Sequence, residues 1–437
     1  MKRRDFLKVT AGVAAGAAAG GRAGEVRSQS QAPAMNLKPE KGARLRVLRW
    51  KRFVQGDEEV WRKNTERFVK ASGIPVRVEA EAWEDVRPKA AVAANVGSGP
   101  DIILGFYDDP HQYPDKLVDL SDLANYLGAK YGGWYETCVR YGTKDGRWIA
   151  LPLGCAGNCI VYRESHIRAA GFGAFPKDTA GFLKLCRALK EKGTPPGFAL
   201  GNAVGDANVW THWLIWSHGA KLVDEKDRVV IASTETVRAL EYAKALYQTF
   251  VPGTLSWLDP DNNTAFLDGR IGMTANGISL YYAAKNDPKL AELAKDIQHA
   301  NMPIGPIGRP TELNLLTQAM VFRYTKYPEA AKEYLRFMWE REQYEPWQQA
   351  SIGYITQPLK AYEASPVWTI DAKHTPFRNA TSAMLYNGYA GRLGYASAAV
   401  MADYIVVNMV AEAASGARTP PEAAQRAQRR AERYYKI

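Results

Sequence analysis

Hydrophobic and polar residues alternate with two different periods in the region after position 43. Over 44–50 and 75–81 the period is two, which predicts β-strands. Over 58–72 and 86–96 the apolar side chains stand three and four positions apart, which predicts two helices. A short apolar run at 101–104 predicts a buried strand. Strands that alternate with helices form parallel sheets, so this region predicts an α/β fold.

Loops after the second and third predicted strands carry side chains suited to ligand binding, namely Trp83, Tyr107 and Asp108. In parallel α/β sheets ligands bind beyond the carboxyl ends of the strands. Indole and phenol rings provide flat apolar surfaces there, and a carboxylate accepts hydrogen bonds. We therefore predict that these three side chains contact a ligand, although a helix cap explains Asp108 equally well.

The first 34 residues have the pattern of an export signal. The basic segment Met1–Lys8 contains the twin arginine Arg3-Arg4, and an uncharged Ala/Gly-rich stretch, Val9–Gly21, follows it. This arrangement resembles a twin-arginine (Tat) signal peptide, and the small residues Ala32–Ala34 predict cleavage after residue 34. A basic tail on a cytosolic protein would leave the Ala/Gly stretch unexplained. We expect the Tat translocase to export the chain to the periplasm.

The length of the chain and its net charge indicate how many domains it has and which partners it is suited to bind. The chain has 437 residues and a net charge of +11. The predicted signal holds six basic and two acidic residues, so its removal leaves 403 residues (437 − 34) and a net charge of +7 (11 − 4). Two domains are expected, because single cores stop growing near about 250–300 residues. The basic residues are spread along the chain, which argues against nucleic acid as a partner but leaves an anionic ligand open.

Residues that would support metal binding or catalysis are scattered. Cys155 and Cys159 lack the Cys-x-x-Cys spacing of metal and redox sites, and the six histidines lie far apart. The sequence has no Gly-x-Ser-x-Gly or His-Glu-x-x-His motif, and no Gly-x-Gly-x-x-Gly follows the first predicted strand. We therefore expect no metal, no cofactor and no catalytic residue. A Tat-exported enzyme that acts on a carbohydrate remains an alternative, because that route often carries cofactor-loaded proteins.

Seven short motifs occur in an order that is typical of one protein family. Each motif alone is weak, because Gly, Pro and Asp occur in the turns of every fold. The motifs are Gly97–Ile103, Leu117–Leu123, Asp145–Pro152, Cys159–Gly171, Ala265–Gly277, Met302–Gly308 and Tyr327–Phe337. With these motifs the chain resembles the carbohydrate class of bacterial extracellular solute-binding proteins, which are related to maltose-binding protein and serve ABC importers.

The resemblance implies a two-lobe periplasmic binding protein fold with a ligand cleft between the lobes. Lobe one is expected to comprise residues 43–153 and 303–355, and lobe two residues 154–302 and 356–437, each with a mostly parallel sheet flanked by helices. A monomer would close its lobes on a sugar by hinge motion and deliver it to the transmembrane subunits of an ABC permease, without catalysis. A polyamine, a metal ion or an organic anion remains an alternative ligand for the same fold.

The same resemblance places further ligand-binding residues at the hinge and in lobe two. The expected contacts are Asn158 in the hinge loop, Asp206, Asn208, Trp210, Asn276 and Tyr281 in lobe two, and Tyr386, Asn387 and Arg392 in the C-terminal loop. Helix capping explains Asp206 equally well, and core packing explains Trp210 better, because Trp213 follows it at helical spacing. Arg392 is the sharper prediction, since its replacement by alanine is expected to weaken binding about tenfold or more.

Overall fold

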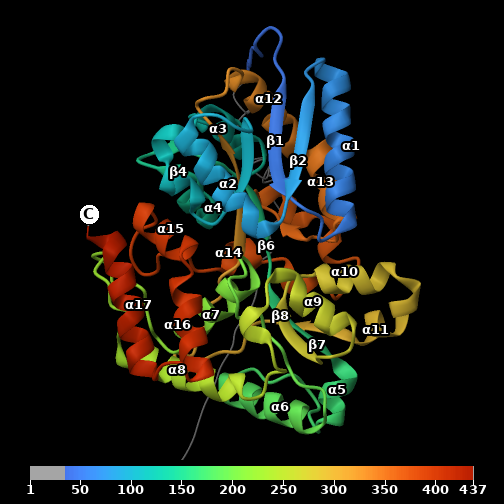
Figure 1. The fold of residues 1–437 in the computed structure, drawn as a ribbon. Helices are drawn as coiled ribbons and strands as arrows, with labels where there is room; N and C mark the ends of the chain where they lie inside the picture. The colour runs from blue at the N-terminus through green and yellow to red at the C-terminus, as the bar shows by residue number, and fades with distance from the viewer. Residues whose placement is uncertain (1–34, 437) are drawn as a thin grey trace, which may run out of the picture. The chain divides into compact units, whose positions relative to one another are not determined.

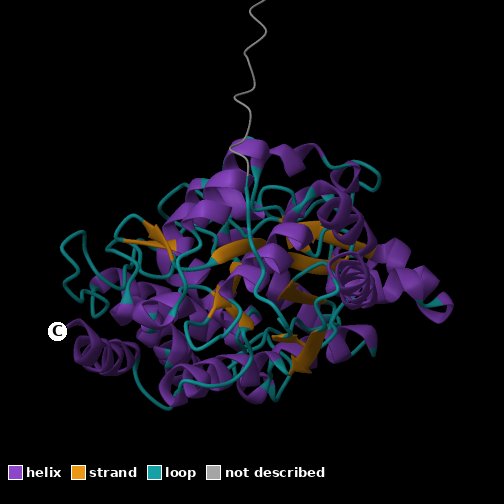
Figure 2. Ribbon diagram, turned by 90° about the horizontal axis from the view of Figure 1, so that it is seen from above, coloured by secondary structure: helices purple, strands orange, loops and turns teal. Residues whose placement is uncertain are grey.

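The computed structural model describes residues 35–436, so the predicted signal peptide lies outside the described residues. The described chain contains two main β-sheets with helices around them (Figures 1 and 2). In spatial order, the first sheet consists of β11 (Ile355–Thr356), β6 (Leu151–Ala156), β10 (Leu315–Val321), β3 (Ile102–Phe106), β1 (Leu45–Trp50) and β2 (Val76–Glu81). The second sheet consists of β8 (Met273–Asn276), β7 (Cys159–Arg163) and β9 (Ile297–Ala300). A separate hairpin pairs β4 (Thr143–Lys144) with β5 (Arg147–Trp148).

The three strands nearest the N-terminus form the parallel unit that the alternating pattern predicts. Strand β1 pairs in parallel with both β2 and β3. Helices α1 (Gln55–Ser72) and α2 (Trp83–Val96) connect these strands. Each ends at a glycine in the left-handed region, Gly73 (φ 72°) and Gly97 (φ 70°), where glycine is tolerated at the lowest cost. Both helices begin three residues earlier than predicted, because their first turns carry acidic residues that favour a helix N-terminus.

The remaining strand pairs are antiparallel, so the prediction of mostly parallel sheets is wrong outside β1, β2 and β3. Strand β10 runs antiparallel to β3 and to β6, and β11 runs antiparallel to β6. In the second sheet β7 lies antiparallel to both β8 and β9. The reason is the path of the chain. Strand β10 enters the first sheet at the end where β3 leaves it, because the chain returns there from the second sheet.

The C-terminal helices pack against the helices of the second sheet. Helix α7 (Asp206–Ser217) is buried along its whole length, and α16 (Ile405–Ser415) packs on it and on α8 (Thr234–Tyr247). Helix α17 (Pro420–Tyr435) lies beside α16 (Figure 1). The stretch Tyr395–Ser415 is long and apolar enough to cross a membrane, but 61% of its apolar window is buried. We therefore interpret it as a core segment.

The other α-helices complete the layers around the two sheets. They are α3 (Ser121–Lys130), α4 (Glu136–Gly142), α5 (Glu164–Ala169), α6 (Thr179–Glu191), α9 (Asp259–Leu267), α10 (Ser279–Asn286), α11 (Ala291–Asp296), α12 (Pro328–Trp339), α13 (Arg341–Ala350), α14 (Ala380–Ala383) and α15 (Tyr395–Ala402). The cysteines Cys138, Cys155, Cys159 and Cys186 are buried and form no disulfide in the described chain.

The chain passes between the two sheets at three places. It leaves the first sheet at the end of β6 and enters the second at the start of β7, after only two intervening residues. It returns between β9 and β10, and it leaves the first sheet again after β11. These crossings lie near the predicted lobe boundaries, and the boundaries themselves stay a prediction.

Candidate functional site

A cavity lies between the elements of the first sheet and those of the second, and the empty space there, including solvent at its mouth, is about 410 Å³. The first-sheet side contributes the aromatic residues Phe53, Trp83 and Tyr354. The second-sheet side contributes the polar residues Asn158, Asp206, Asp259, Asn276 and Ser279. Phe53 and Trp83 follow the carboxyl ends of β1 and β2, which is the edge where the sequence predicts the binding loops.

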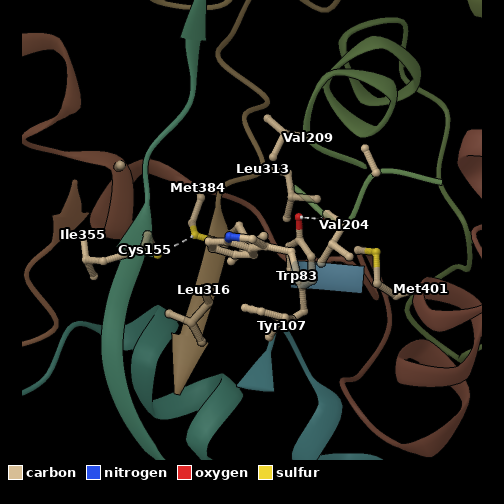
Figure 3. Packing of buried hydrophobic residues seen from close by; sticks show 14 of the residues in the cluster. Trp83, Tyr107, Cys155, Val204, Val209, Leu313, Leu316, Ile355, Met384 and Met401 are labelled. Carbon is tan, nitrogen blue, oxygen red and sulfur yellow. Dashed lines mark hydrogen bonds between the residues drawn. The ribbon is translucent and has the colours of Figure 1, made fainter. Parts of the chain in front are cut away.

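The aromatic wall is held in place by stacking. The Trp83 ring stacks on Phe106 with ring centroids 4.6 Å apart and an angle of 13° between the planes. Trp50 stacks on Trp83 at 5.1 Å, and the ring of Phe53 meets Trp83 edge-on at 5.7 Å. Such contacts fix a large side chain in one orientation. Figure 3 shows Trp83 and Tyr107 among Val204, Val209 and Leu313, so residues from distant parts of the chain pack around this wall.

The acidic part of the polar wall comes from the first residues of two helices. Asp206 begins α7, and its two carboxylate oxygens accept hydrogen bonds from Nδ2 of Asn158 (2.7 Å) and Nδ2 of Asn262 (2.8 Å). Asp259 begins α9, and its carboxylate accepts from the backbone N–H groups of Gly205 (3.1 Å) and Asp206 (2.7 Å). The Asp259 carboxylate therefore caps the N-terminus of α7, where a negative charge is favourable.

The amide part of the polar wall is fixed by its own hydrogen bonds. Nδ2 of Asn276 donates to Oδ1 of Asn263 (2.5 Å), and Oγ of Ser279 donates to Oδ1 of Asn276 (3.3 Å). Nδ2 of Asn263 in turn donates to Oγ of Ser279 (3.1 Å). This small network holds the Asn276 amide at the end of β8, in contact with the cavity.

The electrostatics of the cavity favour a ligand that is not an anion. Burial raises the pKa of Asp206 well above its usual value, and the nearby Asp259 raises it further. Burial also raises the pKa of Asp259 to about 6, against the lowering effect of the backbone N–H groups that it accepts from. Among the described residues that line the cavity, none is a lysine or an arginine. The positive net charge of the chain is therefore not reflected in this cavity.

Four of the predicted site residues line the cavity, namely Trp83, Asn158, Asp206 and Asn276. The sequence-based prediction did not include Phe53, Tyr354, Asp259 or Ser279. Phe53 lies only three residues beyond β1, at the carboxyl end of a parallel strand, so the strand pattern could have indicated it. Tyr354 lies far along the chain from that loop, and its sequence surroundings carry no such signal.

Tyr107, Asp108 and Asn387 lie outside the lining and bind other protein groups. The hydroxyl of Tyr107 donates to the backbone oxygen of Val204 (3.1 Å). Oδ2 of Asp108 accepts from Nδ2 of Asn387 (2.8 Å) and from Oγ of Ser397 (2.5 Å). All three predicted residues are buried. The C-terminal segment thus occupies the space in front of Asp108 that a ligand was expected to fill.

The other five predicted residues also lie outside the lining of the cavity. Trp210 donates from Nε1 to the backbone oxygen of Ala199 (2.6 Å) within the core, which agrees with core packing as the better explanation for this residue. The other four residues also contact protein groups. Asn208 donates a hydrogen bond to the backbone oxygen of Val204, and Tyr281 donates one to Asp371. The guanidinium of Arg140 lies over the Tyr386 ring, and Arg392 forms an ion pair with Asp227. The Arg392 side chain is 88% exposed.

Residues 63–376 match the family described as bacterial extracellular solute-binding protein. The chain belongs to this family. A binding protein of Brucella abortus is 23% identical to this solute-binding protein over 284 residues, which are 62% of this chain and 66% of that protein. An ABC transporter-binding protein of Deinococcus radiodurans is 23% identical over 288 residues, 64% of this chain and 67% of that protein. The match thus covers about two thirds of these relatives.

Solved structures confirm the two-lobe fold of this solute-binding protein. A maltose-bound protein of T. maritima superposes with a TM-score of 0.77 at 17% identity, over 89% of this chain and 99% of that chain. A sugar transporter protein of Arthrobacter chlorophenolicus with bound laminaribiose gives 0.77 at 17% identity, over 90% and 99%. An ABC transporter solute-binding protein of Agrobacterium radiobacter in complex with ribitol gives 0.75 at 18% identity, over 91% and 100%. At such identities the likeness establishes the fold alone.

Proposed function

We propose that this protein captures a sugar or a polyol in the cavity between its lobes and delivers it unchanged to an ABC permease. The pairing of an aromatic wall with a hydrogen-bonding wall supports this function most directly. A sugar has an apolar C–H face and an edge of hydroxyl groups, so it needs one wall of each kind. Maltose, laminaribiose and ribitol, which are bound in the similar structures, share this chemistry.

Hinge closure follows if the ligand contacts both lobes. Trp83 belongs to the proposed lobe one (43–153 and 303–355), and Asp206 to the proposed lobe two (154–302 and 356–437). A ligand between them binds the closed form better than the open form, and this difference in affinity shifts the population toward closure. Two hydrogen bonds between the lobes, from the Tyr107 hydroxyl to Val204 (3.1 Å) and from the Gly56 N–H to the Tyr282 hydroxyl (2.9 Å), would form at the same time.

Each lining residue has a distinct role in this mechanism. Trp83 stacks on the C–H face of the ligand, while Asn158 and Asn276 exchange hydrogen bonds with its hydroxyl groups. Asp206 accepts a hydrogen bond from the ligand in addition to those from Asn158 and Asn262. The eight predicted residues outside the lining stabilise the lobes and their contacts instead.

Export and assembly complete the proposed cycle. The Tat translocase exports the folded chain with its signal of residues 1–34, and the mature protein acts in the periplasm as a monomer. Its partners are a small solute and the transmembrane subunits of the permease. The family consists of extracellular solute-binding proteins, which favours this role over that of an exported carbohydrate-cleaving enzyme.

A ligand screen with two variants tests the function. Thermal unfolding of the purified protein is measured across hexoses, disaccharides and polyols, and scattering then tests whether a binding solute makes the protein more compact. Trp83→Ala is expected to weaken binding about tenfold or more. The matched control is Val92→Ala, which alters a 61% exposed side chain of the same helix and should change nothing. Since Trp83 also packs in the core, Asn276→Ala provides a second test on the opposite wall.

Two results would contradict the proposed function. One is a set of unfolding temperatures and scattering profiles that stay the same with every sugar and polyol. The other is a chemically altered solute after incubation with the purified protein alone, since that result would favour the enzyme.

A further inference from the structure

The carboxylates of the cavity have no cationic partner among the residues that line it. Asp206 and Asp259 are 8% and 7% exposed, and the Asp259 carboxylate accepts a hydrogen bond from the backbone N–H of Asp206 (2.7 Å). The groups that hydrogen-bond to them are neutral amides, from the Asn158 and Asn262 side chains and from the backbone. Amides orient a carboxylate but do not balance its charge. Two buried carboxylates in one cavity therefore repel each other unless a proton or a cation lies between them.

A third carboxylate approaches from the other lobe. Glu84 follows Trp83 in α2, is about half-buried, and lies close to the backbone N–H of Asp259 and to the Asp261 carboxylate. Its Oε1 has no hydrogen-bond partner within residues 35–436. Closure of the lobes thus brings acidic groups of both lobes together, which costs free energy unless the ligand supplies positive charge.

Two further groups at the cavity also lack partners. Oδ1 of Asn158 and Nε1 of Trp83 form no hydrogen bond within the described chain, although the two side chains are only 7% and 5% exposed. Both side chains line the cavity. A buried acceptor and a buried donor are costly to leave unpaired, so the ligand is expected to present both a donor and an acceptor.

The aromatic wall suits a cation as well as a sugar face. Phe53, Trp83 and Tyr354 border the same cavity as the carboxylates. The negative face of an aromatic ring attracts an ammonium group, most strongly where water is excluded. A hydroxylated ligand with an ammonium group would therefore satisfy the carboxylates, the aromatic rings and the unpaired polar groups together.

We propose that the natural ligand is an amino sugar or another amine-bearing polyol, whose ammonium group lies between Asp206 and Asp259 while its hydroxyl groups contact Asn158 and Trp83. This assignment rests on the proposed function, because it names the class of solute that the same cavity captures. It also selects one cargo chemistry, since an acidic sugar or an organic anion would find no cationic side chain among the described residues that line this cavity.

Matched sugar pairs test the assignment. Calorimetric titrations compare D-glucosamine with D-glucose, D-galactosamine with D-galactose and D-mannosamine with D-mannose, so that the members of each pair differ only in an amino or hydroxyl group. At least one amino sugar is expected to bind about tenfold or more tightly than its neutral partner, the usual gain from a charged hydrogen bond. Asp206→Asn should remove most of that preference. The control Asp268→Asn, at an exposed position at the end of α9, should keep it.

The outcomes separate this assignment from the function on which it rests. If no amino sugar binds more tightly than its neutral partner while some sugar or polyol of the wider screen still binds, the charge assignment fails and the capture of sugars stands. If every sugar and polyol of that screen leaves the protein open and unbound, the proposed function fails. Asp259→Asn repeats the test where Asp206→Asn does not fold, and the sugar pairs on the unaltered protein need no variant.

Discussion

Asp108 ties the first sheet to the C-terminal segment and makes a measurable prediction about pH. The residue is completely buried, and Asn387 and Ser397 donate hydrogen bonds to its Oδ2. Its Oδ1 has no partner within residues 35–436. Burial raises its pKa from 3.8 to about 6, although these two donors oppose the shift, and the neighbouring Asp109 raises it further.

The sign of the effect on stability follows from the direction of this shift. The folded protein binds the proton more tightly than the unfolded chain, so the folded state gains stability when Asp108 is protonated. That stability is present at low pH and is lost as the pH rises through about 6. With pKa values of 3.8 unfolded and about 6 folded, Asp108 alone should lower the free energy of unfolding by about 1.3 kcal/mol between roughly pH 5 and pH 7.

Urea unfolding at these two pH values measures the effect. The wild-type protein also contains Asp109, Asp259 and Glu312, whose raised pKa values add to the loss. His111, His212 and His299 oppose it, because burial lowers their pKa values and their contribution to stability rises over the same pH range. The difference between the wild type and Asp108→Asn therefore isolates Asp108: the change in the free energy of unfolding from pH 5 to pH 7 should be about 1 kcal/mol more favourable in Asp108→Asn. Asp115→Asn alters an exposed aspartate nearby and should change between the two pH values as the wild type does. The same change in Asp108→Asn as in the wild type would refute this account of Asp108.

Two further predictions concern residues outside the cavity. Arg392→Ala should leave ligand affinity within about twofold of wild type in a titration, because this exposed side chain pairs with Asp227 and does not line the cavity. A tenfold loss of affinity would show that Arg392 contributes to ligand binding after all. Gly154→Ala should lower the free energy of unfolding by about 2 kcal/mol or more, because its φ is +133° and a Cβ there would lie 1.9 Å from the backbone oxygen of Thr356. Gly146→Ala, with φ +76° and nothing within 4 Å of its Cβ, should cost only about 1 kcal/mol, and equal losses would argue against the clash.

Local pattern determined the N-terminal half of the first sheet. Alternation with a period of two indicated β1 and β2, and helical spacing indicated α1 and α2, because each signal lies within one segment of the chain. The rule that ligands bind at the carboxyl ends of parallel strands then indicated the edge of the sheet where the cavity lies. The order of the family motifs added the two-lobe arrangement.

The tertiary structure alone decided which side chains line the cavity. Asp108 and Phe53 both follow strands of the first sheet, yet Phe53 lines the cavity while Asn387 and Ser397 cover Asp108. The covering residues lie almost 300 positions away along the chain, so no local pattern contains this information. The direction of β10 has the same origin, because it depends on where the chain returns from the second sheet. Periodicity reports which face of an element is buried, whereas contacts between distant segments decide what is buried against it.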